Sequence, residues 1–189
     1  GDDAQAEPFY RRALVIWEKT LGPEHPEVSN SLKSLGLLYR KMGDYTRAET
    51  LYQRALAIDE KTYGSTHAEV AADLNDLGLL HHKMGDYAQA EPLYQRALAI
   101  REKALGLEHP ETAGTLNNLA ELYVATGSYA QAETLHKRAL SIYEKTLGPE
   151  HPSTAASLNN LAGLYESMGA YDRAEPLYPR DLGICEKTL

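Results

Sequence analysis

The chain contains three copies of one stretch, GDYTRAETLYQRALAIDEKT (43–62), GDYAQAEPLYQRALAIREKA (85–104) and GSYAQAETLHKRALSIYEKT (127–146). Their first glycines are spaced by 42 residues, and the same spacing leads forward to Gly169 and back to Gly1. A repeat of this length is typical of a solenoid, in which each unit packs only against its neighbours. We therefore divide the chain into units 1–42, 43–84, 85–126 and 127–168 and a half-unit 169–189, all within a single domain.

Each unit contains two segments with the apolar spacing of an amphipathic helix. In the second unit, the longer segment runs from Tyr45 to about Tyr63 and the shorter one from about Ala68 to Met84. Apolar residues recur every three or four positions in both, and no stretch alternates with the period of a strand. The sequence therefore predicts an all-α chain of about nine helices, stacked as antiparallel hairpins.

Glycine and proline mark the ends of these segments. A glycine follows each segment where a left-handed C-terminal cap is expected: Gly22, Gly43, Gly64, Gly85, Gly106, Gly127, Gly148 and Gly169. Three of the shorter segments begin with a His-Pro pair, at 25–26, 109–110 and 151–152, and proline suits the first position of a helix. The second unit has Ala68 instead of proline, so we expect that helix start to fray more.

Small and aromatic residues recur at fixed positions on the predicted inner faces. Gly36, Gly78, Ala120 and Ala162 share one position of the shorter segments, where small side chains let neighbouring helices approach closely. Of the thirteen tyrosines, eleven fall at three repeated positions: Tyr10, Tyr52, Tyr94 and Tyr178; Tyr45, Tyr87, Tyr129 and Tyr171; and Tyr39, Tyr123 and Tyr165. A repeated aromatic stripe is normally core, so we assign these tyrosines to packing.

Composition limits the classes of function. The net charge of -8 is opposite to that of a nucleic-acid-binding protein and disfavours an anionic membrane surface. No apolar run reaches the roughly 18 residues of a membrane span, and no signal peptide opens the chain. A lone Cys185 suits a reducing compartment, so the cytoplasm is the expected location. The absence of an initial methionine and the half-unit at the end are expected of a fragment of a longer array.

Signatures of catalysis and of metal binding are absent from the sequence. It has no phosphate loop, dinucleotide fingerprint, nucleophile elbow or HExxH, so we expect neither enzyme activity nor a cofactor. His25, His67, His109 and His151 recur once per unit. Helix layers are about 8–10 Å apart, too far for these histidines to share a zinc ion. We expect no metal site, and we expect His81 and His136, which replace tyrosine, to be packed and hydrogen-bonded.

The chain resembles tetratricopeptide repeats in the order of eight residues: Leu158, Leu161, Ala162, Tyr165, Gly169, Tyr171, Ala174 and Tyr178. The 42-residue period and the phrases AEPLYQRAL, EKALGLEHPET and LNNLAELY make it most similar to the repeats of kinesin light chains and related bacterial arrays. The resemblance implies a right-handed α-solenoid whose shorter helices line a concave groove. It also implies an interaction scaffold that binds a peptide or protein partner, although such arrays bind many unrelated partners.

The resemblance places the candidate binding residues on the shorter segments. One groove position carries Lys33, Asn75, Asn117 and Asn159, and the next carries Ser34, Asp76, Asn118 and Asn160. An asparagine side chain offers donors and an acceptor that pair with the N–H and C=O groups of an extended peptide backbone. In the alternative interpretation, these asparagines hydrogen-bond to one another or to neighbouring backbone and hold the helix layers in register.

Charge divides the predicted groove into two halves. The N-terminal half is basic and contains Lys33, Arg40, Lys41 and Lys83, whereas Glu121 and Glu166 make the C-terminal half acidic. Because a concave surface focuses such fields, we expect a bound peptide to carry acidic residues over the basic half.

A second hypothesis belongs to a different class of function, a structural spacer whose uncapped ends associate with other copies. The last half-unit departs from the other copies at Pro179, Asp181 and Gly183, and it also has Pro176 at a position that Pro8 and Pro92 share. Because proline and glycine disfavour a helix interior, we expect the last helix to be bent or frayed.

Overall fold

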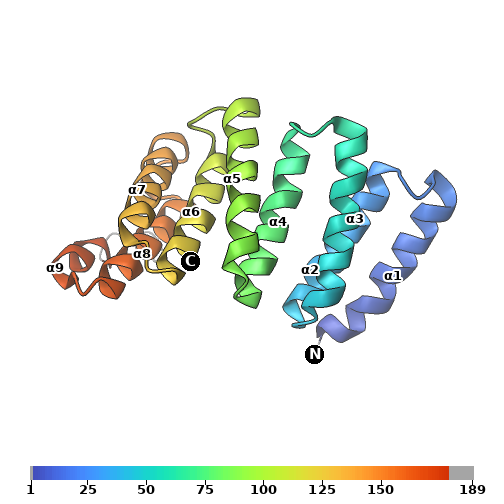
Figure 1. Ribbon diagram of the computed structural model, residues 1–189, viewed down its shortest axis with the longest axis horizontal. Helices are drawn as coiled ribbons and strands as arrows, with labels where there is room; N and C mark the ends of the chain where they lie inside the picture. The colour runs from blue at the N-terminus through green and yellow to red at the C-terminus, as the bar shows by residue number, and fades with distance from the viewer. Residues whose placement is uncertain (1, 179–189) are drawn as a thin grey trace. The chain divides into compact units, whose positions relative to one another are not determined.

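The structure, a computed structural model, describes residues 2–178 of the 189-residue chain, and every regular element in them is helical (Figure 1). The long helices are α1 (Asp2–Leu21), α3 (Tyr45–Tyr63), α5 (Tyr87–Ala104) and α7 (Tyr129–Thr146). They alternate with the short helices α2 (Pro26–Lys41), α4 (Ala68–Met84), α6 (Pro110–Ala125) and α8 (Pro152–Ser167). The described part of the chain ends with α9 (Tyr171–Ala174) and a 3-10 turn, η1 (Glu175–Leu177). These nine α-helices confirm the all-α prediction, and α3 and α4 have the predicted bounds.

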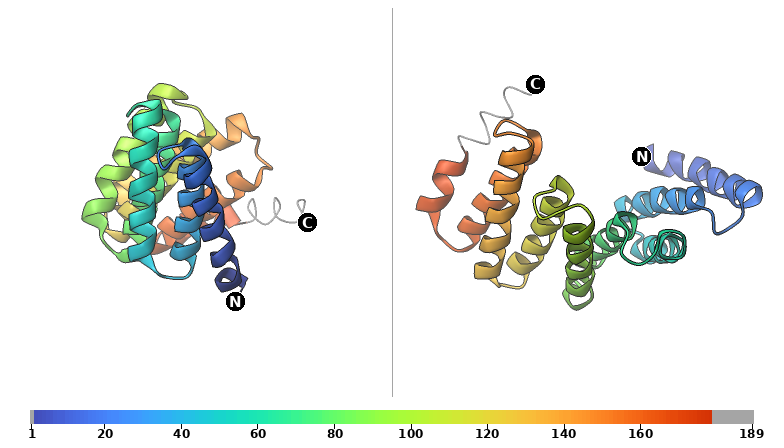
Figure 2. Two further views of the ribbon diagram at one scale, coloured as in Figure 1. Left: turned by 90° about the vertical axis from the view of Figure 1, so that its right-hand side faces the viewer. Right: turned by 90° about the horizontal axis from the view of Figure 1, so that it is seen from above.

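The chain forms two compact units, each larger than one 42-residue repeat, with the boundary inside α5. We call Gly1–Ile100 the first unit and Arg101–Leu189 the second unit. In each unit, long and short helices alternate and neighbouring helices run in opposite directions (Figures 1 and 2). The first unit buries Leu35, Tyr52 and Leu80 in a cluster built from α2, α3 and α4. A cluster around Leu158 and Leu161 of α8 forms a core of the second unit. Each core is therefore shared between successive helices, as expected of stacked repeats.

Glycine ends the helices in two different conformations. The eight glycines named above all have positive φ, between 70° and 104°. Gly85, after short helix α4, has φ 78° and ψ 8°, the left-handed conformation that was predicted. Gly64, after long helix α3, has φ 87° and ψ 152°, outside the left-handed helical region. Both conformations favour glycine because it has no Cβ atom.

Histidine caps the start of every short helix from α2 to α8. The ring nitrogen Nδ1 of His25, His67, His109 and His151 accepts a hydrogen bond from the amide two residues further on, at 3.1–3.2 Å. The bond satisfies one of the amide groups that the first turn of a helix leaves unpaired. Helix α4 begins at Ala68 with this same cap, so the expectation of a more frayed start is not supported. Capping explains why histidine recurs once in each 42-residue repeat.

Most of the predicted core positions are buried. The small residues Ala48, Ala55, Ala90, Ala97, Ala132 and Ala139 have no exposed surface. The packing assignment is wrong for Tyr10, Tyr87 and Tyr171, which are 41%, 36% and 68% exposed. Tyr10 lies on the face of α1 that corresponds through the repeat to the face of α3 around the buried Tyr52.

The last half-unit is described only in part. Its α-helical hydrogen bonding gives way to a 3-10 turn at Glu175–Leu177, the segment that contains Pro176. Pro179, Asp181, Gly183 and Cys185 lie outside the described residues. None of the helices in residues 2–178 is both long enough and apolar enough to cross a membrane.

Candidate binding sites on the short helices

Three of the four predicted basic residues line one hollow of the first unit, which we call the basic hollow. It has a volume of about 300 Å³ and is lined by Arg40, Lys41, Tyr45 and Lys83. Arg40 and Lys41 lie in the last turn of α2, Lys83 lies in the last turn of α4, and Tyr45 begins α3. Within residues 2–178, none of these three cations forms an ion pair. The basic hollow therefore presents positive charge without an internal counter-ion.

Lys33, the fourth predicted cation, lies in an internal charge cluster instead. Its Nζ is 3.0 Å from Oδ2 of Asp59, 3.4 Å from Oδ1 of Asp73 and 3.5 Å from Oε2 of Glu69. Asp59 and Asp73 are each 1% exposed. Burial opposes the charge of Lys33, but the carboxylates of Asp73 and Asp59 outweigh it and raise its pKa. Burial raises the pKa of Asp73, and Lys33 opposes that shift. Lys33 is thus held by acidic side chains of its own chain.

The positions of this cluster carry other polar groups in the later repeats. The 42-residue period relates 33, 59 and 73 to 75, 101 and 115, which hold Asn, Arg and Thr, and to 117, 143 and 157, which hold Asn, Tyr and Ser. In the second unit, Arg101 Nη1 donates to Thr115 Oγ1 at 2.6 Å, and Asn117 Nδ2 donates to Ser157 Oγ at 3.4 Å. Polar contacts between helices therefore recur at these positions, with chemistry that changes from repeat to repeat.

Asn117 belongs to the interior of the second unit. It is 8% exposed, and its Oδ1 lies 2.9 Å from Nδ1 of His136. His136 is 1% exposed, and burial lowers its pKa to about 4, so the ring is neutral at pH 7. His136 is thus packed and hydrogen-bonded, as expected. At Asn117, the contacts favour the alternative interpretation, in which asparagine holds helices in register.

The remaining candidate asparagines lie closer to the surface. Asn159 is exposed and Asn160 is half-buried, and both line a hollow of about 370 Å³ in the second unit. We call it the acidic hollow; its lining residues are Glu121, Val124, His136, Asn159, Asn160, Gly163, Leu164, Glu166, Ser167 and Tyr178. Asn75 and Asn118 are half-buried on α4 and α6, and each already has an interaction partner within the chain.

Hydrogen bonds fix the two carboxylates of the acidic hollow. Asn160 Nδ2 donates to Oε1 of Glu121 at 3.2 Å, which joins α8 to α6. A hydrogen bond with Glu166 raises the pKa of the Tyr178 hydroxyl. The predicted acidic half of the groove therefore includes a hollow whose carboxylates are held by neighbouring side chains.

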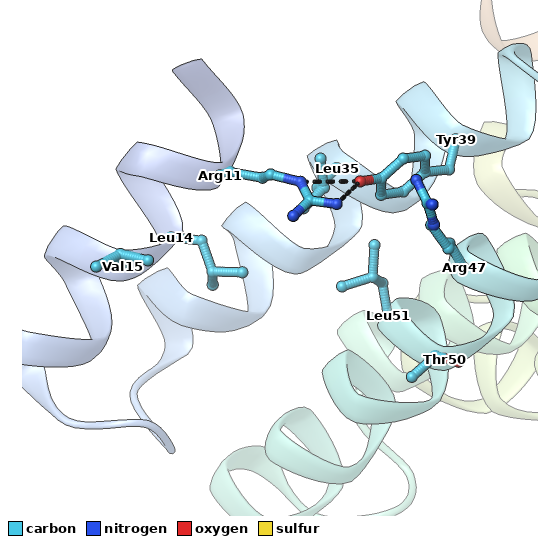
Figure 3. A pocket seen from close by; sticks show the side chains of 8 residues that line it. All are labelled: Arg11, Leu14, Val15, Leu35, Tyr39, Arg47, Thr50 and Leu51. Atoms are coloured by element: carbon cyan, nitrogen blue, oxygen red, sulfur yellow. Dashed lines mark hydrogen bonds between the residues drawn. The ribbon is translucent and has the colours of Figure 1, made fainter. Parts of the chain in front are cut away.

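Sequence reasoning missed a third hollow, between the long helices α1 and α3 above α2 (Figure 3). Its volume is about 380 Å³, and its lining is Arg11, Leu14, Val15, Leu35, Tyr39, Arg47, Thr50 and Leu51. The guanidinium of Arg11 donates to the Tyr39 hydroxyl from Nε at 3.0 Å and from Nη2 at 2.6 Å (Figure 3). The Arg47 guanidinium lies 5.3 Å from the centre of the Tyr39 ring.

Both arginines of this third hollow also have anionic partners. Arg11 Nε is 2.8 Å from Glu7 and Arg47 Nε is 3.2 Å from Asp44. The sequence offered a weak signal, because positions 11 and 47 are arginine in the first layer, glutamine at 53, 89, 95 and 131 in the next two layers, and again cationic at Lys137 and Arg173. The third hollow lies on the long-helix side, and its cations are compensated, so it differs from the basic hollow in both respects.

Comparison with known families identifies the repeats. The tetratricopeptide repeat family matches at residues 1–61, 35–103, 71–145 and 111–186. No curated protein sequence matches the chain.

Solved structures of kinesin-light-chain-like repeats are similar to this chain over its whole length. BtubC (BKLC) from P. vanneervenii is 26% identical with a TM-score of 0.83, and the match covers 100% of this chain and 75% of BtubC. A Podosopora anserina putative kinesin light chain with nearly identical TPR-like repeats is 31% identical with a TM-score of 0.78, covering 100% of this chain and 89% of that one. Aspartyl phosphate phosphatase F from Bacillus subtilis is 16% identical with a TM-score of 0.75, and the match covers 86% of this chain and 41% of the phosphatase. This likeness shows the fold alone.

The family matches overlap one another from residue 1 to residue 186, so the repeat predicted from the 42-residue period is present throughout. Tetratricopeptide arrays generally mediate protein–protein interactions, and no enzyme family was found. The chain therefore belongs to the tetratricopeptide repeat family, with repeats of the kinesin-light-chain-like type.

Proposed function

We propose that this chain is a non-catalytic scaffold that binds an extended segment of a partner protein along its short helices, with acidic residues of that segment in the basic hollow. The observation that carries this proposal is the gathering of Arg40, Lys41 and Lys83 around one hollow without an ion pair among the described residues. Uncompensated positive charge in a hollow attracts and orients an anionic partner.

Helix geometry explains why these cations stay in place without a carboxylate. Each lies in the last turn of a short helix, where the unpaired carbonyl groups carry partial negative charge that stabilises a cation. The side-chain N–H groups themselves are left without an ionic partner within residues 2–178. Arg40 can therefore bind a carboxylate through two parallel hydrogen bonds, while the two lysines add point charges.

Peptide selection on matched variants tests the proposal. A random peptide display library is selected on the native chain, and the enriched peptides are measured by fluorescence polarisation. The hollow variant is Arg40→Gln/Lys41→Gln/Lys83→Gln. Its matched control is Arg12→Gln/Lys19→Gln/Lys103→Gln, which removes one arginine and two lysines from exposed positions on long helices that form no ion pair in the described residues.

The expected result is enrichment of acidic peptides whose affinity is lost in the hollow variant and kept in the control at equal helicity by circular dichroism. Equal affinity for both variants would exclude the basic hollow as the site. Asn117 is not substituted, because its contacts with His136 and Ser157 would confound binding with stability.

The spacer hypothesis has one observation in its favour. Helix α1 leaves Tyr10, Ile16 and Trp17 exposed by 41%, 47% and 39%. A spacer whose ends associate would enrich no peptide on the short helices and would instead change its mass when α1 is altered. Peptide selection and mass measurement therefore separate the two functions.

A further inference from the structure

The acidic hollow of the second unit is built from groups that accept hydrogen bonds. Glu121 and Glu166 face it from α6 and α8. Asn160 donates to Glu121 and orients that carboxylate, and a hydrogen bond with Glu166 raises the pKa of the Tyr178 hydroxyl at the same hollow. Ordering these side chains before a ligand arrives lowers the entropic cost of binding.

The buried ring of His136 also lines the hollow and adds a third acceptor. Oδ1 of Asn117, which can only accept, lies 2.9 Å from Nδ1 of His136, while Nδ2 of Asn117 donates to Ser157 Oγ. The ring proton therefore resides on Nδ1, and Nε2 presents a lone pair. No side chain of residues 2–178 is hydrogen-bonded to Nε2, and the ring, 1% exposed, lines the hollow.

Protonation does not change this arrangement near neutral pH. Burial lowers the pKa of His136 to about 4, so Nε2 stays an acceptor and the ring adds no positive charge to the hollow. An acceptor in the lining of the hollow favours a ligand that donates to it. A ligand that carries positive charge and several N–H groups complements the ring and both carboxylates at once.

We infer that the acidic hollow binds the cationic side chain of an arginine or a lysine in the partner segment. This assignment rests on the proposed function, because it places a residue of the bound partner on the short helices of the second unit. Arginine offers five N–H donors in a fixed plane and lysine offers three. The exposed amide of Asn159 at the same hollow provides one more acceptor.

Nuclear magnetic resonance of the His136 ring tests the assignment directly. The uniformly ¹⁵N-labelled chain is titrated with Nα-acetyl-arginine amide, and long-range ¹H–¹⁵N spectra follow the imidazole nitrogens. Nα-acetyl-citrulline amide, which has nearly the same shape without the charge, is the control ligand. We expect a saturable shift of the His136 Nε2 resonance with the arginine probe, and about tenfold weaker binding of the citrulline probe. The lysine amide is expected to bind as the arginine amide does.

Three variants locate the site. Glu121→Gln and Glu166→Gln each remove one carboxylate of the hollow and are expected to weaken the arginine probe about tenfold. Glu150→Gln makes the same change of charge on the loop between α7 and α8 and should leave the affinity unchanged. An unshifted His136 resonance, or equal weakening by Glu150→Gln, would overturn the assignment.

Acidic peptides bound by the basic hollow are measured on the same preparations. If they bind while the arginine probe does not, the inference about the second unit fails and the proposed function stands. If the arginine probe binds while the acidic peptides do not, the proposal for the basic hollow fails.

Discussion

A Cβ atom placed on Gly78 of α4 would lie 2.8 Å from both Cδ1 and Cε1 of Tyr94 in α5. Carbon atoms without a bond between them prefer about 3.5–4.0 Å. The layer before repeats this relationship, because a Cβ atom on Gly36 would lie 2.9 Å from Cε1 of Tyr52. Both tyrosines are almost completely buried. Glycine at this position is therefore required by the aromatic ring of the following long helix.

The next layer changes both members of the pair. Ala120 stands at the glycine position, and His136 stands at the tyrosine position. Imidazole is smaller than phenol, so a methyl group fits beside it. In the last layer, Ala162 stands with Tyr178, which is only half-buried, so glycine is found where the tyrosine ring is almost completely buried.

Gly78→Ala is expected to destabilise the protein. Overpacking a buried position costs about 1–3 kcal/mol, and alanine returns up to about 1 kcal/mol through its higher helix propensity. We expect a net loss of about 1 kcal/mol in the free energy of unfolding, measured by urea denaturation. Adding Tyr94→His recreates the pair found at Ala120 and His136 and should make the double variant more stable than the two single changes predict.

Gly163→Ala is the matched control for the Gly78→Ala substitution. A Cβ atom on Gly163, in the interior of α8, meets no atom within 4 Å. The substitution should therefore stabilise the protein by about 0.5–1 kcal/mol through helix propensity alone. Equal effects of Gly78→Ala and Gly163→Ala would show that the Tyr94 ring moves aside without cost.

His136 makes the stability of the second unit depend on pH. Its pKa is lowered from 6.5 to about 4 in the folded state, whereas the unfolded chain binds a proton near pH 6.5. The unfolded state therefore gains protons first as the pH falls, and stability is lost from about pH 6.5 down to about pH 4. Between pH 7.5 and pH 5 the loss due to this one group is about 2 kcal/mol.

The variant His136→Gln removes the titrating ring and keeps a donor for Asn117. We expect the unfolding free energy of this variant to fall by about 2 kcal/mol less than that of the native chain over the same pH interval. The difference between the two chains cancels the other histidines, which titrate in both. Parallel pH profiles would mean that burial does not shift the pKa of His136 as described.

Lys33→Met is expected to be strongly destabilising. It leaves Asp59 and Asp73, both 1% exposed, without their cation. Removing one partner of a buried ionic pair typically costs about 3–5 kcal/mol. The measurement is the midpoint of chemical denaturation at pH 7.

A repeat-swap variant separates charge from size at this cluster. Lys33→Asn/Asp59→Arg/Asp73→Thr copies the residues of the next repeat, and it should lose less stability than Lys33→Met because its polar groups match one another. A larger loss in the triple variant would show that the three positions are not exchangeable between repeats.

The sequence predicted the helices well because local signals determine them. Gly64 and Gly85 end α3 and α4 at the expected residues, and the 42-residue period places every later helix. Histidine capping was not predicted, since proline or alanine at the next position gives no indication that the imidazole turns back to the amide after it.

The candidate site was predicted less evenly. Arg40, Lys41 and Lys83 occupy the last turns of two short helices and share one hollow. Lys33 differs because its partners come from positions 26 and 40 residues later, on two other helices, and a period within one helix does not reveal such contacts. Three-dimensional packing, rather than helix position, decides which polar residue faces a ligand.

The exposed face of α1 should cause concentration-dependent self-association. Tyr10, Ile16 and Trp17 correspond through the repeat to positions 52, 58 and 59, which α3 buries to at least 95%. Apolar surface of this kind gains roughly 25 cal/mol for each Å² removed from water. We expect the average mass in sedimentation velocity to rise with protein concentration, and Ile16→Lys/Trp17→Lys to keep the chain monomeric.

Val15→Lys provides the control for this last prediction. Val15 is 45% exposed and lines the third hollow, on the side of α1 that faces α3 (Figure 3). This change adds a lysine to the same helix but leaves the face around Ile16 intact, so association should persist. A native chain that stays monomeric at high micromolar concentration would contradict the prediction and remove the one observation that favours a spacer. Association abolished equally by Val15→Lys would instead place the contact on the α3 side of α1.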